Sequence, residues 1–266
     1  GDIAAGAGRD RQITFAWPAS GADGLFEFIV TADGGTTVFE SNATSTGESN
    51  NSARMTVASA PDLTVANLRL DPATIESGAQ LVLRWDDTNT GNRPVTASWR
   101  DRIEVVNTRT GETLLTADLL HDSTAGGDGA LGAGSSHARA FTFRLPDGAR
   151  GFGAMRITVT SDRNVAGSGT VLEANAGNDA ESNNSAALTV ESALRTYPDL
   201  RAFDFVTPPT ARGGDPVTLS WSVSNDGPVA ATGTWIDRVV LSQDTILGNA
   251  DDRIVAEVTR TLGLAA

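Results

Sequence analysis

The chain has 266 residues with 33 acidic and 20 basic side chains, all of the basic ones arginine, and its formal net charge is −13 at pH 7. Such a charge repels nucleic acid and anionic lipid and attracts cations, and no apolar run reaches the roughly 20 residues of a membrane span, so we expect neither nucleic-acid binding nor membrane insertion. The absence of cysteine excludes disulfides, thiolate metal sites and cysteine nucleophiles.

Short alternating apolar runs, separated by Gly, Pro, Asn and Asp, predict strands along most of the chain. In the run from Leu63 to Leu70 the apolar phase shifts by one residue, which predicts a β-bulge. No apolar stretch keeps a helical period over the length of a helix. Roughly six to eight short strands in about 130 residues favour a two-sheet sandwich. The runs that follow Leu70 are 81–85, 103–106, 141–145, 155–159 and 188–190.

Ordered motifs occur twice along the chain in the same register, which is the strongest signal in the sequence. Pro61-Asp62-Leu63 returns as Pro198-Asp199-Leu200. A constant spacing then relates Trp85, Asn89, Gly91, Trp99, Asp101 and Arg102 to Trp221, Asn225, Gly227, Trp235, Asp237 and Arg238.

A second block of motifs also repeats, with Glu40–Asn42 and Glu48–Ala53 matching Glu173–Asn175 and Glu181–Ala186, and residues 6–18 align without gaps on 134–146. We therefore expect residues 61–197 to form a complete repeat. Residues 1–60 are expected to be the C-terminal part of one repeat and residues 198–266 the N-terminal part of the next. Joining the last residue to the first would complete a second repeat, so we expect a segment of a longer array.

The order of these motifs resembles the bacterial cell-adhesion-related repeat family called CARDB, and the resemblance covers nearly the whole chain. It implies tandem immunoglobulin-like β-sandwiches on secreted or surface-attached bacterial proteins, and it fixes no ligand. One loop departs from the family pattern, because Val105–Thr108 stands where the last copy has Leu241–Asp244. The resemblance is carried by Pro61–Leu63, Trp85, Asn89–Gly91, Trp99–Asp101, Leu145-Pro146, Asp162, Glu173 and Glu181–Asn184.

Four tryptophans are expected in the cores of the sandwiches. Trp85 and Trp221 each lie in an alternating strand, where an aromatic side chain fills the space between two sheets. Trp99 and Trp235 follow polar residues, and core packing is favoured for them over an exposed ligand platform.

Oxygen-bearing side chains on predicted loops form candidate calcium sites, because calcium takes six to eight oxygen ligands in flexible geometry. The alternative, which the sequence leaves open, is that Asp and Asn favour turns and the acids face water. The spacing matches no EF-hand loop. The candidates are Asp33, Glu40, Asn42 and Glu48, their counterparts Asp162, Glu173, Asn175 and Glu181, and a third group of Asp244, Asp251 and Asp252.

No nucleophile elbow, zinc-binding histidine pair, phosphate loop or dinucleotide fingerprint is present, so we expect no enzyme. The sequence indicates a spacer, stalk or filament body of a secreted or surface-attached bacterial adhesin or matrix protein, stiffened by calcium. Its expected partners are neighbouring repeats, copies of itself joined head to tail, and an unidentified adhesion target. The alternative is a carbohydrate- or protein-binding accessory module of a larger secreted enzyme, which would need exposed aromatic residues.

Overall fold

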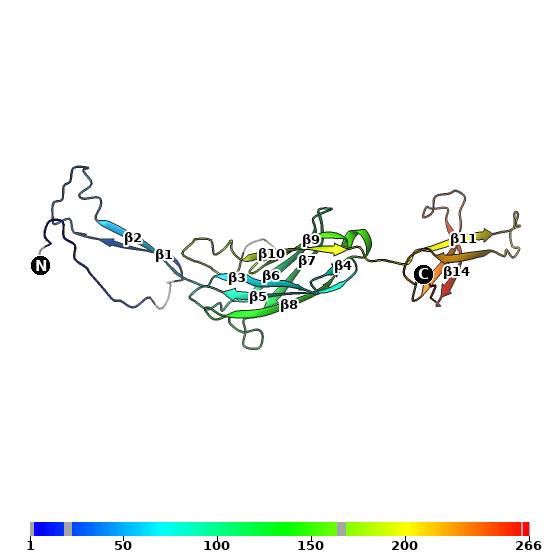
Figure 1. Cartoon of the computed structure of the whole chain (residues 1–266), viewed down its shortest axis with the longest axis horizontal. Coiled ribbons are helices and arrows are strands. Elements are labelled where there is room, and N and C mark those ends of the chain that lie inside the picture. Colours follow the sequence, from blue (N-terminus) through cyan, green and yellow to red (C-terminus); the bar gives the residue numbers. More distant parts are fainter. Residues whose placement is uncertain (1–2, 19–22, 164–168, 262, 266) are drawn as a thin grey trace. The chain divides into compact units, whose positions relative to one another are not determined.

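The computed structural model describes residues 3–18, 23–163, 169–261 and 263–265, and its regular structure is almost entirely β-strand (Figure 1). The all-β prediction is therefore confirmed. The chain divides into two compact units, Gly1–Leu194 and Arg195–Ala266, which are described separately below. Within the described ranges the helical structure is a 3-10 turn, Gly148–Gly151, and no helix has the length and apolar character needed to cross a membrane.

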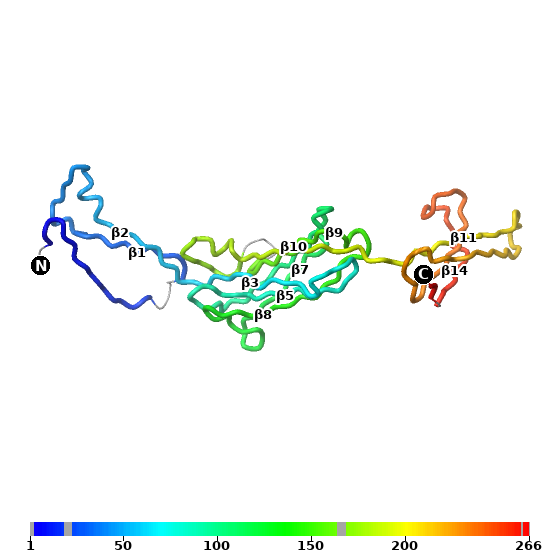
Figure 2. The backbone as a smooth tube through the Cα atoms, viewed as in Figure 1, coloured from blue at the N-terminus to red at the C-terminus, as the bar shows by residue number. Residues whose placement is uncertain are grey.

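Two sheets form the sandwich of the first unit, and their backbone path can be followed in Figure 2. The smaller sheet has the order β3–β5–β8, made of Leu63–Asp71, Gln80–Asn89 and Ser136–Arg144. All strand pairs in both sheets are antiparallel except β4 with β10. The larger sheet has the order β4–β10–β9–β6–β7, made of Ile75–Glu76, Ser185–Ala193, Gly153–Thr160, Trp99–Asn107 and Glu112–His121.

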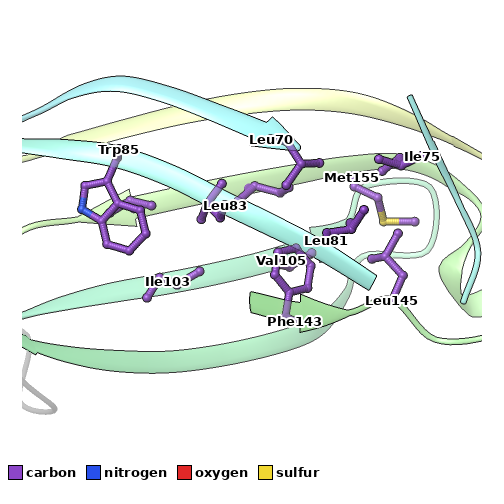
Figure 3. Packing of buried hydrophobic residues seen from close by; sticks show 12 residues of the cluster. Leu70, Ile75, Leu81, Leu83, Trp85, Ile103, Val105, Phe143, Leu145 and Met155 are labelled. Atoms are coloured by element: carbon purple, nitrogen blue, oxygen red, sulfur yellow. The ribbon is translucent and has the colours of Figure 1, made fainter. Parts of the chain in front are cut away.

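The core of the sandwich lies between these sheets and follows directly from the alternation of apolar residues (Figure 3). In β5, Leu81, Leu83 and Trp85 are each 0% exposed, because every second side chain of a strand points to the same face. Ile103 and Val105 from β6 meet them from the opposite sheet. Burying each of these large side chains contributes about 1.5–3 kcal/mol to the free energy of unfolding.

The predicted bulge is present in β3. Its pairing with β5 shifts register between Ala66 and Arg69, and Asn67 has a positive φ of 53°. The second unit repeats this feature, since β11 shifts register between Phe203 and Val206 and Asp204 has a φ of 49°. The one-residue change of apolar phase is therefore a structural bulge, and this prediction is confirmed.

Residues before β3 include a hairpin of β1, Gly24–Thr31, and β2, Ser52–Ser59. The hairpin has the same register as β9 with β10. Thr31 lies opposite Ser52 with their hydroxyl oxygens 2.9 Å apart, and Thr160 lies opposite Ser185 with a separation of 2.8 Å. The rings of Phe15 and Trp17 contact the aromatic side chains of β1 edge to face.

The second unit contains two pairs of antiparallel strands. β11, Leu200–Val206, pairs with β12, Ser220–Asn225, and β13, Trp235–Leu241, pairs with β14, Arg253–Arg260. An isolated bridge joins Ala231 to Leu264, as Val95 is joined to Leu131 in the first unit. Leu264 therefore takes the structural position of Leu131.

Candidate functional site

The repeated Asn-x-Gly motif binds the segment by which the chain enters each sandwich. In the first unit, Asn89 Oδ1 accepts hydrogen bonds from the backbone amides of Asp62 (3.2 Å) and Gly91 (3.1 Å). Its Nδ2 donates to the carbonyl oxygens of Arg93 (2.7 Å) and Leu131 (3.3 Å). Asn89 is 0% exposed, and it uses both its donor and its acceptor capacity here. We call this arrangement the Asn–Gly clamp.

The second unit builds the same clamp from the second copy of the motif. Asn225 Oδ1 accepts from the amides of Asp199 (2.9 Å) and Gly227 (3.2 Å), and Nδ2 donates to the carbonyl of Val229 (2.8 Å). A Cβ atom at Gly227 would lie 2.5 Å from both Tyr197 O and Asp199 N. No side chain fits at that distance, so the motif requires glycine.

The corresponding glycine of the first unit lies equally close to the incoming backbone. A Cβ atom at Gly91 would lie 2.3 Å from Ala60 O and 2.6 Å from Asp62 N. In both units the glycine therefore lets the loop contact the backbone of the incoming chain directly.

Two buried tryptophans bind buried carboxylates in the centre of the first unit. Trp85 Nε1 donates to Asp87 Oδ1 (3.0 Å), and Trp99 Nε1 donates to Asp101 Oδ1 (3.1 Å). Trp85 is 0% and Trp99 1% exposed, and the Trp99 ring stacks on His121 with 3.7 Å between centroids. An indole N–H must find an acceptor when buried, and each aspartate supplies one.

Trp221 and Trp235 of the second unit are half-buried and share one carboxylate. Their Nε1 atoms donate to Asp237 at 3.3 and 3.1 Å. Arg260 Nε lies 3.1 Å from the same side chain. The counterpart of Asp87 in this unit is Val223, which accounts for the single acceptor.

Arg139 from β8 lies between the buried carboxylates of Asp87 and Asp101. Its Nε lies 3.2 Å from Asp101 and 3.4 Å from Asp87, and Nη1 lies 3.5 Å from Asp128. Burial, reinforced by the charge of Asp101, raises the pKa of Asp87 to about 8. Burial also raises the pKa of Asp101, against the lowering effect of Arg139. Asp87 and Asp101 are 0% exposed, so both perturbed groups lie inside the sandwich and not at its surface.

The calcium candidates Asp33 and Asp162 have the same role in two equivalent loops. Asp162 accepts hydrogen bonds at 2.8–2.9 Å from the backbone amides of Thr170 and Val171. Asp33 accepts from Thr37 N (3.0 Å) and Val38 N (2.8 Å), and these bonds hold its pKa below the usual value. Positive φ angles of 45° at Asp33 and 48° at Asp162 fit the turn role.

Asn42 and Asn175 also act as acceptors within these loops. Asn42 Oδ1 accepts from the amides of Thr44 (3.1 Å) and Thr46 (2.9 Å), and Asn175 Oδ1 accepts from Asp179 N (3.2 Å).

The paired glutamates close the same loops. Glu48 Oε1 accepts from Glu40 N (2.7 Å), and Glu181 Oε1 accepts from Glu173 N (3.2 Å). Glu173 is 5% exposed and accepts from Leu63 N (3.2 Å). Burial, assisted by the nearby acids, raises the pKa of Glu173 to about 8.

The third group of calcium candidates binds its own loop between β13 and β14. Asp244 accepts from Ile246 N (2.7 Å), Asp251 from Gln243 N (2.7 Å), and Asp252 from Gly248 N. Across the described ranges, no three His, Cys, Asp or Glu side chains gather in a way that could hold a metal ion. The candidate oxygens accept backbone hydrogen bonds in or beside their loops, and calcium binding stays a prediction.

No family model matches the sequence, and no curated protein matches it. Among solved structures, the chain is similar to a CARDB domain of Pyrococcus furiosus in complex with di-metal ions. The identity is 22%, the match covers 52% of this chain and 99% of that domain, and the TM-score is 0.36.

Two further solved structures are similar to this chain with comparable TM-scores. A domain from Methanosarcina acetivorans, described as belonging to a cell surface protein, is 23% identical over 50% of this chain and 93% of its own, with a TM-score of 0.31. Red sea bream transglutaminase is 13% identical over 79% of this chain and 27% of its own, with a TM-score of 0.29. CARDB domains are thus among the structures that this chain is similar to.

Proposed function

We propose that this chain is a non-catalytic spacer segment of a secreted or surface-attached bacterial protein, in which sandwich modules follow one another along the polypeptide. The observation that carries the proposal is the Asn–Gly clamp. The same amide–glycine pair binds the incoming backbone at Asp62 in one unit and at Asp199 in the other. A device that recurs where the chain enters each sandwich supports a role in fixing how modules are joined.

The rest of the structure supports a mechanical role over a binding role. The accessory-module alternative needs an exposed aromatic platform, whereas Trp99 is 1% exposed and covered by His121. Asp87 and Asp101, whose pKa values are raised, are buried and each accepts a hydrogen bond from a tryptophan. Neither feature offers a surface at which a soluble substrate would be recognised.

The proposal is tested by measuring how widely the distance between the two units varies in solution. Spin labels on exposed positions of β6 and β13 give the distribution of distances across the connection in the 266-residue chain. We expect a narrow distribution that broadens in Asn225→Ala, since this substitution removes the acceptor for Asp199 N.

Ser222→Ala is the matched control, because Ser222 is an exposed residue of the same strand, β12. It should leave the distribution unchanged. A distribution in the unaltered chain as broad as that of a flexible linker would overturn the spacer proposal.

A further inference from the structure

The loop that joins β7 to β8, residues 122–135, packs against a buried histidine. His121, the last residue of β7, is 0% exposed, and its ring stacks on the ring of Trp99 with 3.7 Å between centroids. From the loop, Gly129 O lies 2.9 Å from His121 Nε2, and Leu131, which is 5% exposed, pairs with Val95. Leu131 and Trp99 belong to the same small apolar cluster. His121 therefore lies between Trp99 and the loop, and its ring reaches water only if these neighbours move.

The hydrogen bond to Gly129 determines which ring nitrogen of His121 carries the hydrogen. A carbonyl oxygen only accepts, so Nε2 is the donor, and Nδ1 of the neutral ring is an acceptor. Among the described residues this buried Nδ1 has no hydrogen-bond partner. Asp128 Oδ2, which is also an acceptor, lies 4.0 Å from it. A second proton on His121 would therefore be placed on Nδ1, inside the protein.

Asp128 is the anion that faces Nδ1, and its charge is shared with two other basic side chains. Arg139 Nη1 lies 3.5 Å from Asp128 Oδ2, and His137 Nε2 lies 3.8 Å from Oδ1. Burial is the largest reason that the pKa of His121 lies below the ordinary histidine value of about 6.5, and the charges of Arg139 and His137 act in the same direction. The hydrogen bond to Gly129 and the charge of Asp128 oppose this shift without cancelling it. The guanidinium of Arg139 also pairs through Nε with Asp87 and Asp101.

The second unit has a permanently charged residue at the equivalent position. Trp99 lies opposite His121 in the pairing of β6 with β7, and Trp235 lies opposite Arg260 in the pairing of β13 with β14. Arg260 Nε lies 3.1 Å from Asp237, and an arginine in a protein does not lose its proton. The titratable side chain at this position is therefore a property of the first unit.

We propose that His121 is an acid-sensitive latch for the loop of residues 122–135. The neutral ring holds the loop through the carbonyl of Gly129, and a protonated ring leaves Trp99 for water, so that the loop opens. Since the closed loop disfavours the charged ring, closure is complete above pH 6.5 or so and weakens as the pH falls. The opening equilibrium should shift by up to about thirtyfold between pH 7.5 and pH 5, the largest effect that one histidine of ordinary pKa can have over this range. The inference goes beyond the spacer role, because it gives one module a response to acid.

Amide hydrogen exchange in the whole chain tests the latch, with rates corrected for the intrinsic effect of pH. The loop amides of Asp128 and Gly129 donate to Asp122 O (2.7 and 3.1 Å), and Leu131 N donates to Val95 O (3.0 Å). Their protection should fall severalfold to about thirtyfold between pH 7.5 and pH 5. Peptides from β9 should not lose protection over the same range, because the opening is local.

Two substitutions separate the histidines. His121→Gln keeps an N–H donor for Gly129 O and cannot take up a proton, so loop protection should be the same at both pH values. His137→Gln is the matched control, since it removes the other histidine beside Asp128, and the loss of protection in acid should remain.

Titration by nuclear magnetic resonance tests the latch even if His121→Gln does not fold. The chain has two histidines, so the ring signals of His137→Gln report His121 alone. The midpoint should lie below 6.5, and the neutral ring should carry its hydrogen on Nε2. A midpoint at or above 6.5, equal loop protection at pH 7.5 and pH 5, or the same acid loss in His121→Gln would each overturn the proposal. The spacer role depends on the separate measurement of distances between the units.

Discussion

Replacing Arg139 by methionine removes the positive charge between two buried carboxylates while keeping most of the side-chain volume. The Arg139 side chain is 5% exposed, and the side chains of Asp87 and Asp101 are 0% exposed. The same guanidinium also donates to the carbonyl of Leu120 (2.8 Å). The substitution therefore leaves two carboxylates buried without a counter-charge and a carbonyl without its donor.

The expected loss in the free energy of unfolding is about 3–5 kcal/mol at pH 8, the usual consequence of breaking a buried ion pair from one side. At pH 5 the loss should be smaller, because burial already raises the pKa of Asp87 and of Asp101 and both can take up a proton in the folded state. Arg150→Met is the control. Its ion pair with Glu112 is exposed, and its loss should cost about 1 kcal/mol or less.

Amide hydrogen exchange in peptides from β5 and β6 measures this free energy for the first unit alone, whatever the second unit does. A loss in Arg139→Met no larger than in Arg150→Met would refute the reasoning. So would a loss that is the same at pH 5 and pH 8.

Three further predictions concern Asp87, the apolar core and the calcium candidates. Because the pKa of Asp87 is raised to about 8, its stabilising contribution is complete below the ordinary aspartate pKa and is lost as the pH rises through about 8. Hydrogen exchange should therefore show the first unit losing stability from pH 4 to pH 8.5, and less so in Asp87→Asn. Leu83→Ala should destabilise its unit by about 2–5 kcal/mol in urea unfolding. Leu219→Ala should cost clearly less, because that counterpart is half-buried, and equal costs would contradict this. The calcium prediction expects a higher melting midpoint in calcium than in EDTA, by about 2.7 kcal/mol of stability at 100 times the Kd. Identical midpoints would leave the candidate oxygens as turn acceptors only.

Local patterns in the sequence were sufficient for most strands of the first unit. Alternation sets which side chains of β5 face the core, and the shifted phase after Val65 predicts the bulge at Asn67, because both depend on neighbours in the chain. β7 was not predicted. Its adjacent leucines, Leu114-Leu115 and Leu119-Leu120, break the alternation, and its pairing with β6 shifts register between Val105 and Val106.

The buried network was harder to predict, because it depends on strand order. Arg139 reaches Asp101 only because β8 and β6 lie in facing sheets, and no local spacing reports that contact. One signal was available, since Trp85 and Asp87 have the same spacing as Trp99 and Asp101. For the calcium candidates, the sequence cannot distinguish a turn from a metal site, because the side chains that accept backbone amides in turns are also those that bind calcium.

The parallel pairing of β4 with β10 determines how the first sandwich would respond to a pulling force. β4 follows β3 in the chain and runs parallel to β10, the last strand of this sandwich. The chain therefore enters the sandwich at β3 and leaves it after β10 at the opposite end (Figure 1). Tension along the polypeptide would pull β3 along its own axis. β3 would then slide along β5, so their hydrogen bonds must break together instead of one by one. The first bonds to be loaded lie at the clamp, where Thr90 N donates to Asp62 O (2.7 Å) and Asn89 accepts from Asp62 N. The clamp is therefore the first part of this sandwich to bear the shear force.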